Sequence, residues 1–195
     1  MSRSKFASGG GLALELAGVY EADLDACMSP NPLNVLFLCT HNSARSILAE
    51  ALLNHLGQGR FRAYSAGSSP REHQRPNPLA LETLRAAGIP VAGLSSKSWH
   101  GFAQVHAPHM DLIITVCDSA ASEVCPVWPG HPATAHWGYA DPSAIHGDEH
   151  AKRQAFAHTL DLLRHRLAVL VNLPEAQLAP EMLAQTAREL ARQHP

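Results

Sequence analysis

Short apolar runs alternate along this chain with apolar residues at helical spacing. The runs at residues 33–38 and 110–116 are typical of strands buried on both faces, and residues 61–65 and 134–137 are predicted as two further strands. Elsewhere apolar residues recur at steps of three and four, as one face of a helix requires: Leu48, Leu52 and Leu56; Ala80, Leu84 and Ala87; Phe156, Leu160, Leu163, Leu167 and Leu170; Leu183, Ala187 and Leu190. Because strands that alternate with helices form parallel sheets through right-handed crossovers, we expect an α/β fold. The expected architecture is a single-domain three-layer sandwich whose four-stranded parallel sheet is flanked by helices.

Breaker residues suggest how the chain is divided. The sequence Ser-Pro-Asn-Pro at residues 29–32 closes an opening stretch rich in serine and glycine. We predict an N-terminal appendage over residues 1–32, helical or disordered, a main domain over residues 33–172, and a C-terminal helical tail over residues 173–195. A chain of 195 residues with 46% hydrophobic content can bury one substantial core, so no second domain is expected.

Charge and hydropathy narrow the classes of partner. The net charge is −2 with histidine neutral, and lysine and arginine are scattered, which argues against nucleic acid or an anionic membrane as a partner. The apolar stretch at residues 12–19 is short and is interrupted by Glu15, so it does not predict a membrane span. We expect a cytoplasmic protein.

Four cysteines, Cys27, Cys39, Cys117 and Cys125, are too few for the disulfide framework of a small secreted domain. Cys39 and Cys117 directly follow the first and third predicted strands. The carboxyl ends of parallel strands meet at one edge of the sheet, where ligands of such folds bind. We therefore expect these two thiols at the same edge, while Cys27 lies in the appendage as a bystander.

The segment between the first strand and the following helix has the chemistry of an oxyanion site. It consists of Cys39, Thr40, His41, Asn42, Ser43, Ala44, Arg45 and Ser46. Amide groups of such a loop can converge on an anion in front of a helix N-terminus. The guanidinium of Arg45 can grip two oxygens of that anion, which lysine cannot do. The same positive potential predicts that the pKa of Cys39 lies well below that of a free thiol.

Cys39 to Ser46 resembles the Cys-x5-Arg-Ser phosphate loop of low-molecular-weight tyrosine phosphatases and of their arsenate reductase relatives. The resemblance extends in order through the sequences at residues 46–50, 64–67, 125–126 and 137–142, and so covers roughly residues 33 to 172. It implies a phosphatase-like fold and a nucleophilic cysteine. It also implies that Asp141 is the general acid; the alternative is that an aspartate before Pro142 only forms a turn or caps a helix.

The three cysteines favour the reductase branch of that family. By resemblance, Cys39 attacks arsenate, Cys117 attacks Cys39 and releases arsenite, and Cys125 attacks Cys117, each by thiol–disulfide exchange. The resemblance implies no bound cofactor and no metal, with electrons supplied by thioredoxin or by glutaredoxin and glutathione. The stretch between Cys117 and Cys125 is one residue longer than in the better-known thioredoxin-coupled relatives, so both reductants stay candidates.

Other functions remain open at this level. A phosphatase is the first alternative, but such enzymes usually carry tyrosine after the Asp-Pro pair, where this chain has Ser143. A non-catalytic oxyanion sensor is the second. A zinc site of Cys117, Cys125, His131 and His136 is a weaker alternative, since no Cys-x-x-Cys or close histidine pair supports it.

Overall fold

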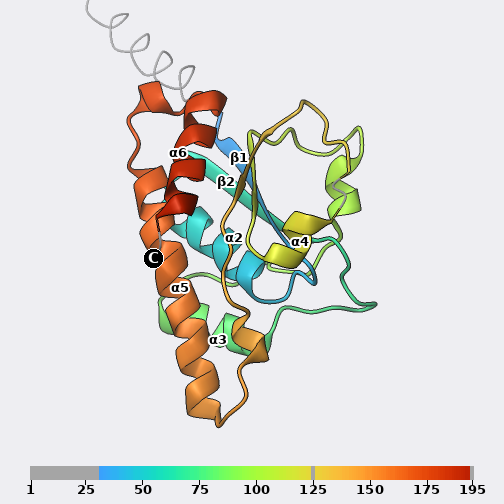
Figure 1. Cartoon of the computed structure of the whole chain (residues 1–195), viewed down its shortest axis with the longest axis vertical. Coiled ribbons are helices and arrows are strands. Elements are labelled where there is room, and N and C mark those ends of the chain that lie inside the picture. Colours follow the sequence, from blue (N-terminus) through green and yellow to red (C-terminus); the bar gives the residue numbers. More distant parts are fainter. Residues whose placement is uncertain (1–30, 124–125, 194–195) are drawn as a thin grey trace, which may run out of the picture. The chain divides into compact units, whose positions relative to one another are not determined.

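The computed structural model describes residues 31–123 and 126–193 (Figure 1). Four strands form one sheet in the order β2-β1-β3-β4, and every neighbouring pair is parallel. Their bounds are β1 Leu33–Cys39, β2 Phe61–Gly67, β3 Leu112–Thr115 and β4 Ala133–His136. The predicted four-stranded parallel sheet is confirmed.

The four predicted helices occur in the expected order along the chain, and a fifth, α4, lies between β3 and β4. The α-helices are α2 Arg45–Leu56, α3 Pro78–Ala86, α4 Asp118–Ser122, α5 Glu149–Val171 and α6 Pro180–Arg192. Short 3-10 helices occur at η1 Trp99–Ala103, η2 Pro142–Ala144 and η3 Glu175–Gln177. No helix in the described part of the chain is both long and apolar enough to cross a bilayer.

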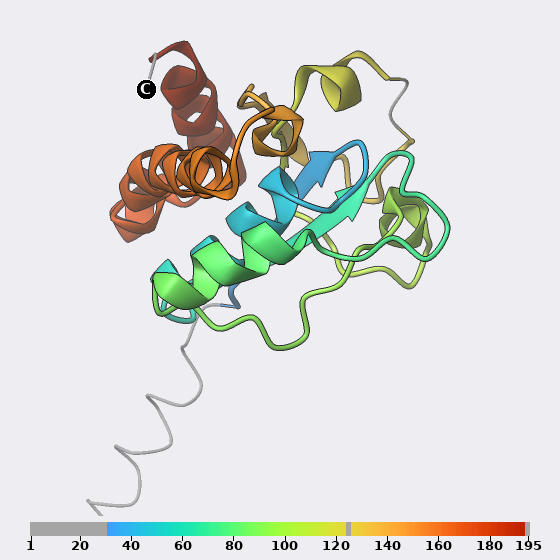
Figure 2. The same cartoon turned by 90° about the horizontal axis from the view of Figure 1, so that it is seen from below.

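The two faces of the sheet are covered differently. On β1, Val35 and Phe37 belong to a large core with buried residues of α2, α5 and α6, whereas Leu36 and Leu38 belong to a smaller core. This opposition follows from the period of two along a strand. The smaller core is closed by η1 and by Trp128. Figure 2 shows the long helices gathered on one side of the sheet.

The C-terminal helix packs into the large core. Leu183, Ala187 and Leu190 of α6 are buried there, as their helical spacing requires. The indole Nε1 of Trp137 donates to Ala187 O at 2.8 Å. Helix α6 therefore holds the chain just after β4, from which the next loop leaves toward the site.

Two local expectations differ from the structure. Strand β3 is limited to Leu112–Thr115, shorter than the apolar run 110–116 that predicted it. Residues 118–122 form the short helix α4, which the spacing of apolar residues did not predict. Alanine favours helix, and Ala120 of α4 is fully buried in the large core, which stabilises this single turn.

Candidate active site

The loop from Cys39 to Ser46 joins the end of β1 to the start of α2. Cys39 is the last residue of the strand and Arg45 the first of the helix. The helix has no side-chain cap at Ala44 and no acidic residue in its first turn. Its first amide groups and the positive end of its dipole are thus available to an anion.

Main-chain carbonyls of the loop are turned toward neighbouring segments. Thr40 O accepts from Ser69 N (2.9 Å), Asn42 O accepts from Ser96 Oγ (2.6 Å), and Ser43 O accepts from Asn77 N (2.8 Å). Amides can then converge on the loop interior, as in other anion-binding nests. One of them, Asn42 N, donates to Cys39 Sγ at 3.1 Å.

Asn42 holds the loop from within. It is fully buried and has φ of 52°, a left-handed conformation that asparagine tolerates better than most residues. Its Nδ2 donates to Ser46 Oγ (2.9 Å) and Ser65 Oγ (2.7 Å), and its Oδ1 accepts from Lys97 N (2.7 Å). Ser46 Oγ in turn lies 2.9 Å from Cys39 Sγ. Asn42 therefore orients the hydroxyl that contacts the sulfur.

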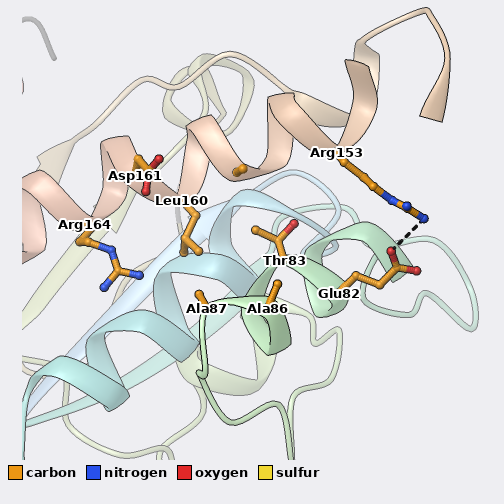
Figure 3. A pocket seen from close by; sticks show the side chains of 9 residues that line it. Glu82, Thr83, Ala86, Ala87, Arg153, Leu160, Asp161 and Arg164 are labelled. Carbon is orange, nitrogen blue, oxygen red and sulfur yellow. Dashed lines mark ion pairs between the residues drawn. The ribbon is translucent and has the colours of Figure 1, made fainter. Parts of the chain in front are cut away.

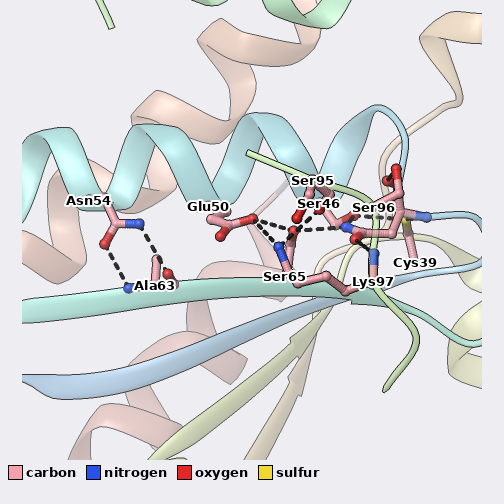
Figure 4. Close-up of polar contacts among 10 residues, drawn as sticks. Cys39, Ser46, Glu50, Asn54, Ala63, Ser65, Ser95, Ser96 and Lys97 are labelled. Carbon is pink, nitrogen blue, oxygen red and sulfur yellow. Dashed lines mark hydrogen bonds and ion pairs between the residues drawn. The ribbon is translucent and has the colours of Figure 1, made fainter. Parts of the chain in front are cut away.

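This network ends at a buried carboxylate (Figure 4). Ser65 Oγ donates to Glu50 Oε2, and Lys97 Nζ lies 3.4 Å from the same oxygen. Burial raises the pKa of Glu50, and the charge of Lys97 and the hydrogen bond from Ser65 oppose that rise. Ser65 donates to Glu50 and Asn42 donates to both serines, so one chain of hydrogen bonds connects the buried carboxylate to the hydroxyl that contacts the Cys39 sulfur.

Gly67 at the end of β2 allows the loop to approach the sheet closely. A Cβ at this position would lie 2.7 Å from Thr40 O and 3.0 Å from Asn42 N. Both are main-chain atoms of the oxyanion loop, so the loop itself would have to move. The Ala66-Gly67 sequence is therefore a packing requirement of the site.

We expect Gly67→Ala to lower the free energy of unfolding by about 1–3 kcal/mol, the usual cost of overpacking. Activity should fall by about 100-fold, because the displaced loop no longer holds its anion in line with Cys39. Denaturant unfolding and nitrophenyl phosphate hydrolysis measure the two effects. Gly101→Ala is the matched control, since a Cβ there meets nothing within 4 Å. Equal behaviour of the two variants would contradict the close approach.

The pKa of the Cys39 thiol differs from the one that the sequence predicted. Its residue is only 4% exposed, and burial raises the pKa of Cys39. The hydrogen bonds from Ser46 and Asn42 act in the opposite direction but are outweighed, and the nearby Cys117 adds to the rise. The prediction of a lowered pKa is therefore wrong for this form of the loop. One physical reason is that Arg45 is engaged elsewhere.

The raised pKa of Cys39 predicts slow alkylation at neutral pH. The midpoint of ionisation of a thiol with a raised pKa lies above the ~8.5 of a free thiol, so reactivity should keep increasing with pH beyond that point. The same sign means that this thiol contributes stability below pH ~8.5, which is lost as pH rises toward its folded pKa. Iodoacetamide labelling followed by mass spectrometry isolates Cys39 from the other cysteines. A labelling rate that levels off below pH 7 would contradict the burial effect.

Arg45 and Asp141 lie together. Arg45 Nη2 is 3.0 Å from Asp141 Oδ2, and Arg45 Nη1 donates to Tyr139 O at 2.9 Å. The Asp141 side chain is 40% exposed and that of Arg45 14%. Asp141 Oδ1 also accepts from Ser143 N, which fixes the start of η2. The structure thus brings two of the predicted site residues into one ion pair.

Cys117 lies beside the loop. It follows β3, which pairs with β1, and its Sγ is 3.6 Å from Thr40 Oγ1. Cys117 is buried and is the residue that precedes the first turn of α4. Because Leu38 pairs with Thr115 and Thr40 contacts Cys117, both thiols lie at the same edge of the sheet. Cys125, the third predicted relay residue, lies outside the described residues, as does Cys27.

Other features of the surface lie apart from this loop. A groove of about 570 Å³ between α3 and α5 is lined by residues of those helices and the position after α3, among them Glu82, Arg153 and Leu160 (Figure 3). It includes none of the predicted site residues. Among the described residues, no group of three or more histidine, cysteine or acidic side chains is placed to hold a metal ion.

Sequence reasoning missed the residues that support the loop from a distance. Ser96 and Lys97 come from an irregular segment before η1, where no periodicity distinguishes them. Tyr139 contributes through its carbonyl, which every residue type possesses. Gly67 could have been identified from the sequence, because a glycine at the end of a strand indicates that another segment approaches the backbone closely.

The chain is similar to known proteins over most of its length. The family model described as low molecular weight phosphotyrosine protein phosphatase matches residues 34–184. An arsenate reductase of Bacillus licheniformis is 37% identical over 134 residues, 68% of this chain and 91% of that protein.

Solved structures show the same fold. A thioredoxin-dependent arsenate reductase of Corynebacterium glutamicum aligns with a TM-score of 0.51 and 24% identity, over 78% of this chain and 70% of that one. A low molecular weight protein tyrosine phosphatase from T. tengcongensis aligns with a TM-score of 0.58 and 22% identity, over 71% of this chain and 97% of that one. At these identities the likeness concerns the fold.

Proposed function

The chain belongs to the low molecular weight phosphotyrosine protein phosphatase family, and from that premise we propose that it reduces arsenate to arsenite. The observation that carries the proposal is the second buried thiol, Cys117, beside the oxyanion loop of Cys39. Ester hydrolysis has no use for a second thiol, whereas reduction of arsenic requires a source of two electrons. The Bacillus licheniformis relative bears the name of an arsenate reductase.

In the first step Cys39 forms a bond to arsenic. Hydrogen arsenate, a dianion, binds to the loop amides, and Arg45 turns from Asp141 to two of its oxygens. Because the thiol is protonated, it passes its proton to the bound dianion, which gives a thiolate and dihydrogen arsenate. Asp141, freed when Arg45 turns to the anion, takes up a proton from solvent. The sulfur then attacks arsenic, and one hydroxyl of the arsenate leaves as water with that proton from Asp141. The product is a thiol–arsenate adduct with arsenic still pentavalent.

In the second step the electrons come from sulfur. Cys117 attacks Cys39 Sγ, the S–As bond breaks, and its electron pair stays with arsenic, which becomes trivalent. The Cys117 proton goes to the departing arsenite, and a disulfide links the two cysteines. Bridge formation requires Cα atoms within ~7 Å, and pairing of β1 with β3 favours such an approach.

In the third step Cys125 attacks Cys117 and restores the Cys39 thiol. The oxidised pair is then Cys117 and Cys125, which a thioredoxin or a glutaredoxin with glutathione reopens by the same exchange. Helix α4 lies between these two cysteines and has only five residues. A single turn is marginal in isolation, so it can unwind at small cost when Cys125 approaches.

Phosphatase activity is the second candidate, because the Cys39 loop, Arg45 and Asp141 would serve a phosphate ester equally well. The assay that decides measures arsenate-dependent oxidation of NADPH through thioredoxin and its reductase, or through glutathione and glutaredoxin. Nitrophenyl phosphate hydrolysis is measured beside it on the same preparation. Robust hydrolysis with no arsenate-dependent oxidation in either system would refute the reductase proposal. Binding of arsenate without either activity would favour a sensor.

A further inference from the structure

Arg166 is a buried guanidinium on α5 without an acidic partner among the described residues. The residue is 7% exposed, and its Nε and Nη1 have no hydrogen-bond partner in the described part of the chain. Its Nη2 donates to Gln193 O at 3.2 Å, beyond the end of α6. A buried charge of this kind is costly unless other interactions compensate.

Two aromatic rings provide the compensation. The guanidinium carbon lies 4.9 Å from the centre of the Tyr139 ring and 5.8 Å from that of Trp137, both within cation–π range. Burial raises the pKa of Tyr139 to about 12, with the charge of Arg166 opposing the rise, so the phenol is neutral. Both rings are themselves buried, Trp137 completely.

The segment held in this way leads directly to the site. Tyr139 accepts from Arg45 Nη1 through its carbonyl, and Asp141, two residues later, accepts from Arg45 Nη2. The position of the Tyr139 ring therefore affects the two acceptors of Arg45.

We propose that Arg166 is a positioning residue for the catalytic centre, whose stacking on Trp137 and Tyr139 fixes the segment that presents the Tyr139 carbonyl and Asp141 to Arg45. The inference rests on the proposed function for the role of Asp141. It does not depend on whether arsenate or a phosphate ester is the substrate. Arg166 touches neither Cys39 nor the loop amides, and acts through the main chain of residues 137–141.

The test compares Arg166→Met with Arg153→Met, an exposed arginine of the same helix. Methionine is a long unbranched side chain but carries no charge, so it cannot form the cation–π contacts with the two rings. We expect kcat of Arg166→Met to fall about tenfold, part of the ~100-fold that a 1 Å misplacement can cost. The part of its kcat–pH profile that depends on the proton of Asp141 should shift along the pH axis, while KM changes less than kcat. Arg153→Met should match the wild type.

A double-mutant cycle separates positioning from simple destabilisation. Tyr139→Leu removes the stacked ring, and the combined variant should lose no more activity than either single variant, because both delete one interaction. A lower melting temperature with kcat and pH profile unchanged per folded molecule would overturn the proposal. If Arg166→Met does not fold, Tyr139→Leu is compared with the wild type in its place, because it removes the same contact between the guanidinium and the ring.

Nitrophenyl phosphate hydrolysis and inorganic phosphate binding by calorimetry are measured beside arsenate turnover. Wild-type protein that hydrolyses the ester without reducing arsenate would contradict the proposed function alone. Wild-type and Arg166→Met proteins with equal kcat, pH profile and phosphate affinity would contradict the positioning role alone.

Discussion

Replacing Arg45 with lysine is expected to lower kcat/KM for arsenate by about 100-fold or more, although the positive charge is kept. The guanidinium uses two nitrogens at once in the structure, toward Tyr139 O at 2.9 Å and Asp141 Oδ2 at 3.0 Å. A fork of this kind can exchange both contacts for two oxygens of a tetrahedral anion. Lysine has one nitrogen and cannot hold two oxygens in fixed directions.

Two measurements distinguish loss of binding from loss of chemistry. Calorimetry with inorganic phosphate reports the affinity of the loop, and single-turnover hydrolysis of nitrophenyl phosphate reports the attack by Cys39. Both should weaken in Arg45→Lys, since Arg45 serves the ground state and the transition state. Arg62→Lys on the exposed side of β2 is the control. Unchanged KM and kcat in Arg45→Lys would contradict the bidentate role.

The strands and the loop were predictable because they depend on short-range patterns. The apolar run before Cys39 predicts a buried strand. The Cys-x5-Arg spacing fits a loop that joins the end of a strand to the start of a helix, and few other structures require this spacing. The register of β1 with β3 brings Cys117 to the same edge, which parallel strands dictate once both are identified. In each case the decisive residues are close together in sequence or follow from the topology.

The ionisation of Cys39 was not predictable in the same way. The loop pattern indicates amide dipoles and Arg45, all of which lower the pKa of a thiol. Burial depends instead on how segments distant in sequence pack together, since the core that includes Cys39 also contains residues of α5 and α6. The position of the Arg45 side chain is likewise set by its hydrogen bonds to Tyr139 and Asp141, which lie over ninety residues away in sequence. The balance between desolvation and positive potential is therefore a property of the tertiary structure.

Cys117→Ser should abolish arsenate reduction while reducing ester hydrolysis far less. Without this thiol the adduct on Cys39 has no neighbouring electron donor, so arsenite cannot leave and reductant consumption falls below detection. Cys125→Ser provides the contrast, because it should release one arsenite per chain and then stop with a disulfide between Cys39 and Cys117. Rapid-quench arsenite measurement with thiol mapping by mass spectrometry resolves the two outcomes. Multiple turnovers by Cys117→Ser would show that an external thiol attacks the adduct directly. The second buried cysteine would then belong to the core alone.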